Sequence, residues 1–224
     1  MSLRIGDIAP NFVAETTQGA IDFHEWIGKH WCILFSHPKD FTPVCTTELA
    51  EAAGLHAKFL SRDCKLIGLS VDTVADHKSW FTDIKIATGR DIQFPLIGDE
   101  NLDIAKLYNM LPASAGSNAT GRTANDNKTV RSVFLIAPGK TIRAMMTYPM
   151  TTGREFGEIL RLLDSLQITE NHKVATPAGW FSDDEVLIVP SVSNEEAEIL
   201  FPDGWRSPLP YLRFVKPSSL GESS

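Results

Sequence analysis

The chain is poor in cysteine. It has three, Cys32, Cys45 and Cys64, among 224 residues. A small domain held together by disulfides needs several paired cysteines, so this odd count excludes the disulfide-stapled class. The remaining composition, 43% hydrophobic and 22% charged, is typical of a globular chain long enough to bury a sizeable core.

The sequence also lacks an excess of positive charge and long apolar runs. Its formal net charge of −7 argues against binding to nucleic acid or an anionic membrane through bulk charge. No uncharged apolar stretch approaches the roughly 18 residues of a membrane span, and the start MSLRIGDIAPNF has no apolar core behind basic residues. We therefore expect a cytoplasmic protein without nucleic-acid or membrane partners. In that compartment an unusual cysteine is more often catalytic or redox-sensing than structural.

Motifs for metals and nucleotide cofactors are missing as well. The six histidines are scattered, and neither a His-x-x-x-His pair nor cysteines at zinc spacing occur. A glycine-rich GxGxxG or Walker loop is absent too. The sequence thus predicts a protein that uses no cofactor and no metal.

Apolar patterning predicts strands that alternate with helices. The predicted strands are 31–36, 65–71 and a hairpin of 130–137 and 141–149 around Pro138-Gly139-Lys140. The predicted helices are 46–62, 75–84, a short one after Asp99 as its N-cap, and 153–167. This order predicts an α/β fold in which helices cover both faces of a sheet.

The composition changes near Glu170. Beyond His172 the chain has several prolines, short apolar pieces such as VLIVPSV and a polar tail, which predict a small irregular second domain. We place the domains at 1–170 and 171–224. Within the first, residues 112–128 form a polar loop long enough to indicate a functional or mobile connection.

Cys45 is the candidate for reactivity. It stands between the strand 31–36 and the first long helix, at or just inside the helix N-terminus, where backbone N–H groups and the helix dipole favour a thiolate. The hydroxyl of Thr42 can reach the sulfur or an oxygen bound beside it, and Pro38 can shield the site from water. The alternative is a small buried cysteine in a strand–helix turn, with Thr42 as a mere N-cap.

Cys45 has no nearby partner thiol. A thioredoxin-like dithiol site requires Cys-x-x-Cys, whereas Cys45 is followed by Thr46, Thr47 and Glu48. The natural chemistry of a single thiol is oxidation by a peroxide to a sulfenic acid, followed by reduction from outside.

The string Pro38-x-x-x-Thr42-x-x-Cys45 resembles the peroxidatic signature of the peroxiredoxins, and its context WCILFSHPKDFTPVCTTELA resembles the one-cysteine subfamily. The resemblance continues through Arg131 and the TTGR segment to KVATPAGW and VPSVS, so it covers essentially the whole chain. It implies a thioredoxin-like core, with a central mixed sheet flanked by helices, and a small C-terminal dimerisation domain. It also implies a homodimer or a higher oligomer.

The activity implied by the resemblance is that of a thiol-specific peroxidase in antioxidant defence. Such an enzyme reduces hydrogen peroxide and organic hydroperoxides to water and alcohols through a cysteine sulfenic acid. An external thiol of glutathione or thioredoxin type then recycles the cysteine.

The resemblance also assigns roles to residues. Cys45 is the peroxidatic nucleophile, Thr42 hydrogen-bonds the peroxide, and Pro38 shields the site. Arg131 stabilises the thiolate and orients the peroxide oxygens, a role suited to a permanently charged fork of donors. Without the resemblance, Arg131 is an ordinary charge at a strand edge.

Three supporting residues follow from the same resemblance. Glu48 holds an arginine in place, Arg154 is a second arginine at the site, and His37 lies beside the sulfur. From the residues alone, Glu48 is equally a partner of the helix dipole, Arg154 an ordinary helix-start charge and His37 a solvated loop histidine.

The resolving cysteine of two-cysteine relatives is missing from its usual place, where this chain has Thr176 before Pro177. Cys64 lies beyond the far end of the helix that starts near Cys45, on the order of 25 Å away at 1.5 Å per residue. A disulfide needs Cα atoms within about 7 Å, which excludes Cys64. Cys32 is typical of a core residue, but resolution through Cys32 or between chains stays open.

A rival from another class is a holdase-type chaperone or a redox-sensing interaction protein. In that case oxidation of the cysteine would switch assembly instead of clearing peroxide.

Overall fold

A computed structural model describes residues 3–115 and 126–220 of the chain. The chain divides into two compact units, Met1–Phe156 and Gly157–Ser224. Part of the polar loop predicted over 112–128 lies outside the described residues. Among the described residues, no helix is both long enough and apolar enough to cross a membrane.

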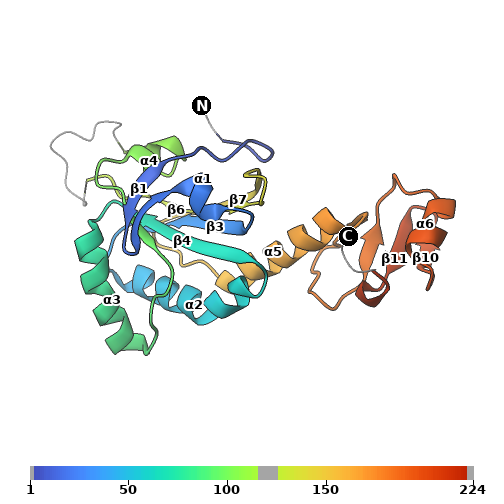
Figure 1. Ribbon diagram of the computed structural model, residues 1–224. Helices are drawn as coiled ribbons and strands as arrows, with labels where there is room; N and C mark the ends of the chain where they lie inside the picture. The colour runs from blue at the N-terminus through green and yellow to red at the C-terminus, as the bar shows by residue number, and fades with distance from the viewer. Residues whose placement is uncertain (1–2, 116–125, 221–224) are drawn as a thin grey trace. The chain divides into compact units, whose positions relative to one another are not determined.

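The first unit is built on a seven-stranded mixed sheet (Figure 1). Its strands are β1 (Val13–Thr16), β2 (Gly19–Asp22), β3 (Trp31–Ser36), β4 (Cys64–Ser70), β5 (Leu96–Gly98), β6 (Arg131–Ile136) and β7 (Ile142–Tyr148). They lie in the order β2-β1-β5-β4-β3-β6-β7. Strands β3, β4 and β5 pair in parallel, and β6 pairs antiparallel with both β3 and β7. All six residues of β3, in the middle of this sheet, are buried.

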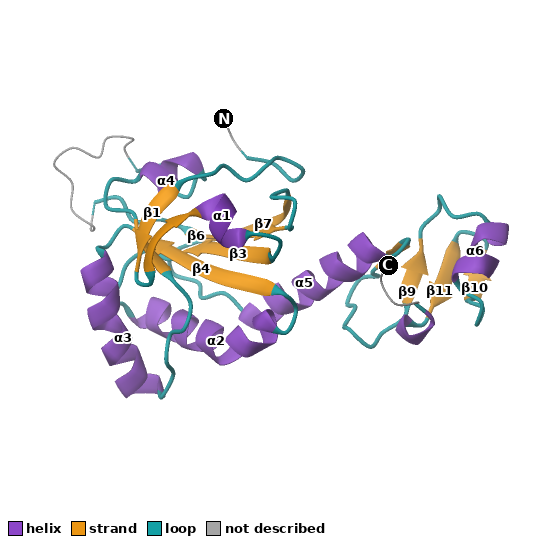
Figure 2. Cartoon of the chain, viewed as in Figure 1, coloured by secondary structure: helices purple, strands orange, loops and turns teal. Residues whose placement is uncertain are grey.

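Helices cover both faces of this sheet. They are α1 (Phe23–Ile27), α2 (Pro43–Leu60), α3 (Val74–Thr88) and α4 (Asp103–Leu107). Figure 1 shows α2 and α3 on one face and α1 and α4 on the other, and Figure 2 shows the strands between these two layers. The predicted α/β fold, a mixed sheet flanked by helices, is confirmed.

Alternate residues of β3 face these two layers, because successive side chains of a strand point to opposite faces. Cys32 and Leu34 belong to the apolar cluster that contains Phe23 of α1 and Ala105 of α4. Phe35 points the other way, where its ring contacts Phe94 and Phe156. The face between β3 and α2 is therefore separated by the sheet from the face that holds Cys32.

The register between β3 and β6 extends this division to the next strand. Leu34 lies opposite Phe134, and Phe35 lies opposite Val133. Arg131 is two residues from Val133 and so shares its face. The sheet thus directs the Arg131 side chain toward α2.

The predicted elements of the first unit are largely present. The strand over 31–36 has the predicted bounds, and β6 and β7 form the predicted hairpin. Helix α2 begins at Pro43 rather than at 46, because proline fits the first helical position and Thr42 supplies the extended N-cap backbone. Helix α3 extends to Thr88, since Thr73 and Asp76 form a capping box at its start and Gly89 ends it in a left-handed conformation.

The prediction that Asp99 is the N-cap residue of α4 is wrong. That position belongs to Leu102, which has φ 61° and makes no capping hydrogen bond with its side chain. The Asp99 carboxylate nevertheless accepts from the N–H groups of Ile104 (3.1 Å) and Ala105 (2.7 Å). Asp99 thus pairs with N–H groups of the first turn that have no partner within the helix, as an N-cap side chain does, but from three residues before the N-cap position.

The second unit combines α5 (Phe156–Asn171) with a four-stranded antiparallel sheet. Its other elements are β8 (Val174–Ala175), β9 (Val186–Ile188), α6 (Asn194–Leu200), β10 (Arg206–Leu209), β11 (Leu212–Val215) and a 3₁₀ turn, η1 (Pro217–Ser219). Trp180, Val186 and Phe201 belong to its apolar core. The unit is more regular than its prolines suggested, because short strands joined by turns tolerate them. The composition changes where α5 ends, whereas the compact units divide where α5 begins.

Candidate active site

Cys45 is the third residue of α2, and its side chain is completely buried. The extended backbone of Thr42 (φ −121°, ψ 147°) leads the chain into the helix. Just before it, Phe41 has φ 54°, a left-handed conformation that is uncommon for a bulky residue and costs of order 1–3 kcal/mol. This turn delivers the sulfur to the positive end of the helix dipole.

Arg131 contacts the Cys45 sulfur directly. Its Nη1 donates to Sγ at 3.3 Å. The rest of the guanidinium is anchored by the Met150 carbonyl, which accepts from Nε (3.0 Å) and Nη2 (2.5 Å). Arg131 is only 2% exposed, so the strand-edge interpretation is wrong. A buried, doubly anchored fork presents a fixed donor to the sulfur.

The carboxylate of Glu48 joins two arginines. It accepts from Nη1 of Arg131 and, at 2.8 and 2.9 Å, from Nε and Nη2 of Arg154. Nη1 of Arg154 donates to the carbonyls of Ser36 (2.8 Å) and Ser132 (3.0 Å), which fixes the guanidinium against β3 and β6. Glu48 therefore contacts both Arg131 and Arg154, and all three side chains are buried together.

The charges of this cluster are unequal. Arg131 and Arg154 bring two positive charges, and Glu48 brings one negative charge, all with side chains at most 2% exposed. Burial raises the pKa of Glu48, but hydrogen bonds and the charge of Arg154 more than offset this and hold the pKa below its usual value. Burial lowers the pKa of Arg154, and the hydrogen bond and charge of Glu48 offset this only in part. The buried cluster therefore carries one positive charge in excess, beside the sulfur that Arg131 contacts.

Thr42 and Pro38 lie in the loop between β3 and α2. The hydroxyl of Thr42 donates its hydrogen to the Lys39 carbonyl at 2.9 Å. With that hydrogen committed, its oxygen can only accept a further hydrogen bond, as from the O–H of a peroxide. Pro38 is buried.

His37 follows β3 directly and is completely buried, so the interpretation as a solvated histidine is wrong. Its ring lies 5.4 Å, between centroids, from that of Trp80 in α3, and the indole N–H donates to Thr46, the neighbour of Cys45. The hydrogen-bond partner of His37 is Asp40: Nε2 lies 2.7 Å from Oδ1. Nδ1 is buried and has no hydrogen-bond partner among the described residues.

Asp40 and His77 are site residues that the sequence analysis missed. Oδ2 of Asp40 lies 2.5 Å from Nδ1 of His77 in α3, so one carboxylate joins two histidines. All three side chains are completely buried. The spacing His37-x-x-Asp40 is visible in the sequence, but His77 is brought to it by the parallel crossover from β4 through α3.

His37, Asp40 and His77 could in principle hold a metal ion, since one nitrogen or oxygen atom of each lies within 4.8 Å of the others. The separations of 2.5 and 2.7 Å are those of hydrogen bonds. Two atoms bound to one zinc ion in a tetrahedral site lie about 3.3 Å apart. Hydrogen bonding therefore describes His37, Asp40 and His77 better than metal coordination.

The other two thiols lie in the sheet. Cys32 points into the cluster on the α1–α4 face, and Cys64 opens β4 opposite Trp31. Burial raises the pKa of both thiols, which keeps them protonated and poorly nucleophilic. All three cysteines are free.

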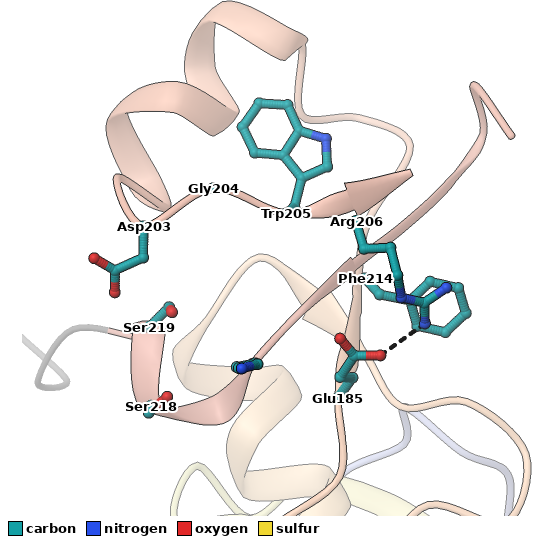
Figure 3. A pocket seen from close by; sticks show the side chains of 9 residues that line it. Glu185, Asp203, Gly204, Trp205, Arg206, Phe214, Ser218 and Ser219 are labelled. Atoms are coloured by element: carbon teal, nitrogen blue, oxygen red, sulfur yellow. Dashed lines mark hydrogen bonds and ion pairs between the residues drawn. The ribbon is translucent and has the colours of Figure 1, made fainter. Parts of the chain in front are cut away.

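A separate pocket, of about 610 Å³, is formed by residues of the second unit (Figure 3). Arg206 pairs with Glu185 at 2.7 Å, and its guanidinium stacks 4.1 Å from the centroid of the Phe214 ring. Lys216 and Asp203 complete its charged lining. The pocket contains none of the residues predicted for chemistry, and we assign it no part in the reaction.

Two family models match the chain. The AhpC/TSA family covers residues 5–145, and the C-terminal domain of 1-Cys peroxiredoxin covers residues 165–204.

Curated relatives match nearly the whole chain. The mitochondrial peroxiredoxin PRX1 of Saccharomyces cerevisiae is 49% identical over 215 residues, which cover 96% of this chain and 81% of the yeast protein. The 1-Cys peroxiredoxin of Dictyostelium discoideum is 45% identical over 94% of this chain and 84% of its own length. Peroxiredoxin-6 of Gallus gallus is 46% identical over 95% of this chain and 97% of its own length.

Solved structures agree with the fold. A cysteine-to-serine mutant of the Peroxiredoxin 6 of Arenicola marina superposes with a TM-score of 0.86 at 44% identity, over 96% of this chain and 98% of its own. The yeast mitochondrial 1-Cys peroxiredoxin, whose thiol is resolved via glutathione/thioredoxin systems, also has a TM-score of 0.86, at 48% identity over 96% of this chain and 99% of its own.

Proposed function

The chain belongs to the AhpC/TSA family, in its 1-Cys peroxiredoxin branch, and from this premise we propose that Cys45 is the peroxidatic nucleophile. The protein is a thiol-dependent peroxidase of antioxidant defence that an external thiol reduces. The observation that carries the assignment of Cys45 is the 3.3 Å hydrogen bond from Arg131 to its sulfur, at the start of a helix.

The proposed reaction begins with the Cys45 thiolate, which attacks the terminal oxygen of the peroxide. An S–O bond forms as the O–O bond breaks, and the cysteine becomes a sulfenic acid while water or an alcohol leaves. Arg131 stabilises the negative charge that moves from sulfur to oxygen, and Thr42 accepts a hydrogen bond from the peroxide. Glu48 holds Arg131 and Arg154 in place, and Pro38 excludes water.

Peroxide consumption by single-cysteine variants tests this proposal. Stopped-flow mixing of Cys45→Ser with hydrogen peroxide should show no rapid phase, whereas Cys32→Ser and Cys64→Ser should react as the wild type does. Rapid reaction of Cys45→Ser would refute the assignment. Slow peroxide consumption by the wild type and by all three variants, together with assembly that depends on oxidation, would favour the chaperone or sensor class.

The substrate range that we propose includes hydrogen peroxide and organic hydroperoxides. Phe41 supports the second class, because this residue is 51% exposed directly before Thr42, and its ring lies 6.2 Å from the Trp80 ring between centroids. An apolar ring at this position can contact the organic part of a hydroperoxide.

We propose that glutathione or a thioredoxin-type protein supplies the reducing thiol, as with the yeast relative. We also propose that the enzyme is cytoplasmic, which fits three cysteines that are all free. Immunofluorescence with a cytosolic marker tests the location, and recycling assays with each reductant test the thiol.

A homodimer, or a higher oligomer of dimers, is the proposed assembly. Apolar side chains exposed on the second unit support it, since monomers rarely leave large apolar areas open. These side chains include Phe181, Ile199 and Tyr211, which are 64%, 81% and 75% exposed. Light scattering during gel filtration should give at least twice the mass of one chain.

A further inference from the structure

A chain of hydrogen bonds runs through the layer between the sheet and α3. It starts at the Ile97 carbonyl of β5, which lies 3.0 Å from Nε2 of His77. It continues from Nδ1 of His77 to Asp40, and from Asp40 to Nε2 of His37. It ends at Nδ1 of His37, the buried ring nitrogen with no partner among the described residues.

The acceptors in this chain determine the protons of His77. A carbonyl oxygen and a carboxylate oxygen have no hydrogen to donate, so both nitrogens of His77 must carry one. His77 is therefore an imidazolium cation, and Asp40 is its counterion. Burial opposes a charge on His77, but the hydrogen bond and charge of Asp40 outweigh burial and raise its pKa.

The same logic determines the tautomer of His37. The carboxylate of Asp40 accepts at Oδ1, so Nε2 of His37 carries the hydrogen and Nδ1 of the neutral ring has a free lone pair. Burial tends to raise the pKa of Asp40, yet its hydrogen bonds with the two histidines lower it to about 2. The carboxylate of Asp40 thus stays ionised. It keeps the hydrogen of His37 on Nε2 and the free lone pair of His37 on Nδ1.

The loop that carries Asp40 is held as firmly as its side chain. The backbone N–H of Asp40 donates to Oδ2 of Asp72 at 2.9 Å, and Ser70 donates to the same oxygen at 2.8 Å. Asp72 also adds negative charge near His77, which favours the imidazolium. Among the described residues, Asp40 contacts His77 directly, Asp72 acts through its charge, and the ring of His37 lies 6.0 Å from that of His77 between centroids.

His37 lies on the same face of the sheet as Cys45. Its ring is close to Trp80 of α3, which hydrogen-bonds Thr46. Directly before it, the Ser36 carbonyl accepts from Arg154, which shares Glu48 with the arginine on the sulfur. Two paths of contacts thus lead from His37 toward Cys45. One runs through Trp80 to Thr46, and the other runs from the Ser36 carbonyl through the arginines and Glu48 to the sulfur.

We propose that Asp40 and His77 are positioning residues for the peroxidase reaction, which hold His37 as a neutral base with its lone pair on Nδ1. This deepens, and rests on, the proposed role of Cys45. Nδ1 accepts the proton of the Cys45 thiol, and the thiolate then attacks the peroxide. The S–O bond forms as the O–O bond breaks, the sulfenic acid keeps the hydrogen of the attacked oxygen, and His37 returns its proton to the leaving oxygen.

The protonation states can be read on the wild-type protein at pH 7. Long-range ¹H–¹⁵N spectra of histidine-labelled protein should show both nitrogens of one buried ring protonated, assigned to His77 by the His77→Gln spectrum. A second buried ring, His37, should be protonated at Nε2 alone. A His77 with one bare nitrogen, or a His37 with its hydrogen on Nδ1, overturns the proposal.

The kinetic test compares two variants by stopped flow at pH 5 and pH 8. Asp40→Asn can donate its amide to His37 and reverse the tautomer, so its peroxide rate constant should fall at least about tenfold at both pH values. His77→Gln leaves the Asp40 carboxylate but removes the cation beside it. The pKa of Asp40 should therefore rise, so that Asp40 is protonated at a higher pH than in the wild type. Its rate constant should be at least about tenfold low at pH 5 and within about twofold of wild type at pH 8.

Asp99→Asn is the matched control, since Asp99 is another buried carboxylate, and it accepts hydrogen bonds from the backbone of α4. Its rate constant should equal that of the wild type at both pH values, with circular dichroism used to choose a temperature at which every variant is folded. Equal losses of His77→Gln at pH 5 and pH 8, or full activity of Asp40→Asn, overturn the proposal. Failure of the Cys45 assignment is distinct, because Cys45→Ser would then react rapidly.

Discussion

Cys32 and Cys45 lie on opposite faces of the seven-stranded sheet. Cys32 packs in the cluster with α1 and α4, whereas the sulfur of Cys45 accepts from Arg131 on the α2 face. A disulfide between them requires the sulfurs to meet within about 2.05 Å. Within one folded chain the sheet separates the two thiols, so β3 would have to unpair before Cys32 could resolve a sulfenic acid on Cys45.

We therefore expect Cys32→Ser to turn over as fast as the wild type with an external thiol. Serine is nearly isosteric, but its hydroxyl is buried among apolar groups, so a loss of stability of about 1–3 kcal/mol is expected. Steady-state peroxide consumption and denaturant unfolding measure the two effects. A variant that reacts once with peroxide and then stops would instead identify Cys32 as the resolving thiol.

Glu48→Gln should destabilise the protein strongly. Among the described residues, Glu48 is the acidic side chain that pairs with Arg131 and Arg154, so glutamine leaves two buried guanidinium groups without this counterion. Breaking a buried ion pair in this way costs about 3–5 kcal/mol. The peroxide rate constant should fall as well, because Arg131 loses a partner that fixes its direction.

Glu158→Gln is the control for that variant. Glu158 pairs with Arg161 at 2.6 Å, but its side chain is 43% exposed, and surface pairs contribute about 0–1 kcal/mol. Urea unfolding of both variants provides the comparison. A loss for Glu48→Gln no larger than that for Glu158→Gln would contradict the role given to the Glu48 cluster.

The sequence predicts the site only as far as local patterns and the resemblance extend. The strand–turn–helix that carries Cys45 follows from apolar runs and from the proline near the start of α2, because these signals are local. Arg131 is 86 residues away from Cys45, and nothing in its own neighbourhood indicates burial. Only the resemblance identified it. Asp40 and His77 had no such guide, since their contact depends on the crossover through α3.

Phe41→Asn tests the proposed contact between Phe41 and an organic hydroperoxide without disturbing the backbone. Asparagine tolerates the left-handed conformation of Phe41 better than most residues, so the turn before Thr42 should be kept. The rate constant for cumene hydroperoxide should fall several-fold because an apolar contact is lost, whereas that for hydrogen peroxide should stay the same. An equal fall for both substrates, measured by stopped flow, would show that Phe41 supports the turn and does not select the substrate.

The Asp40–His77 pair also predicts how stability depends on pH. The pKa of His77 is raised on folding, so its contribution is fully present below the unfolded value near 6.5 and is lost as the pH rises through the folded value. The pKa of Asp40 is lowered to about 2, so its contribution is present above about 4 and is lost as the pH falls toward 2. The pair should stabilise the fold most between about pH 4 and 6.5.

Chemical unfolding of the wild type and His77→Gln at pH 5.5 and pH 9 measures this effect. The wild type should exceed the variant by more at pH 5.5 than at pH 9. His56→Gln should show the opposite slope, because burial lowers the pKa of His56 and protonation below about 6.5 therefore destabilises the fold. Should the advantage over His77→Gln grow toward pH 9, His77 would be neutral in the folded protein, and Asp40 would have no cation to keep it ionised.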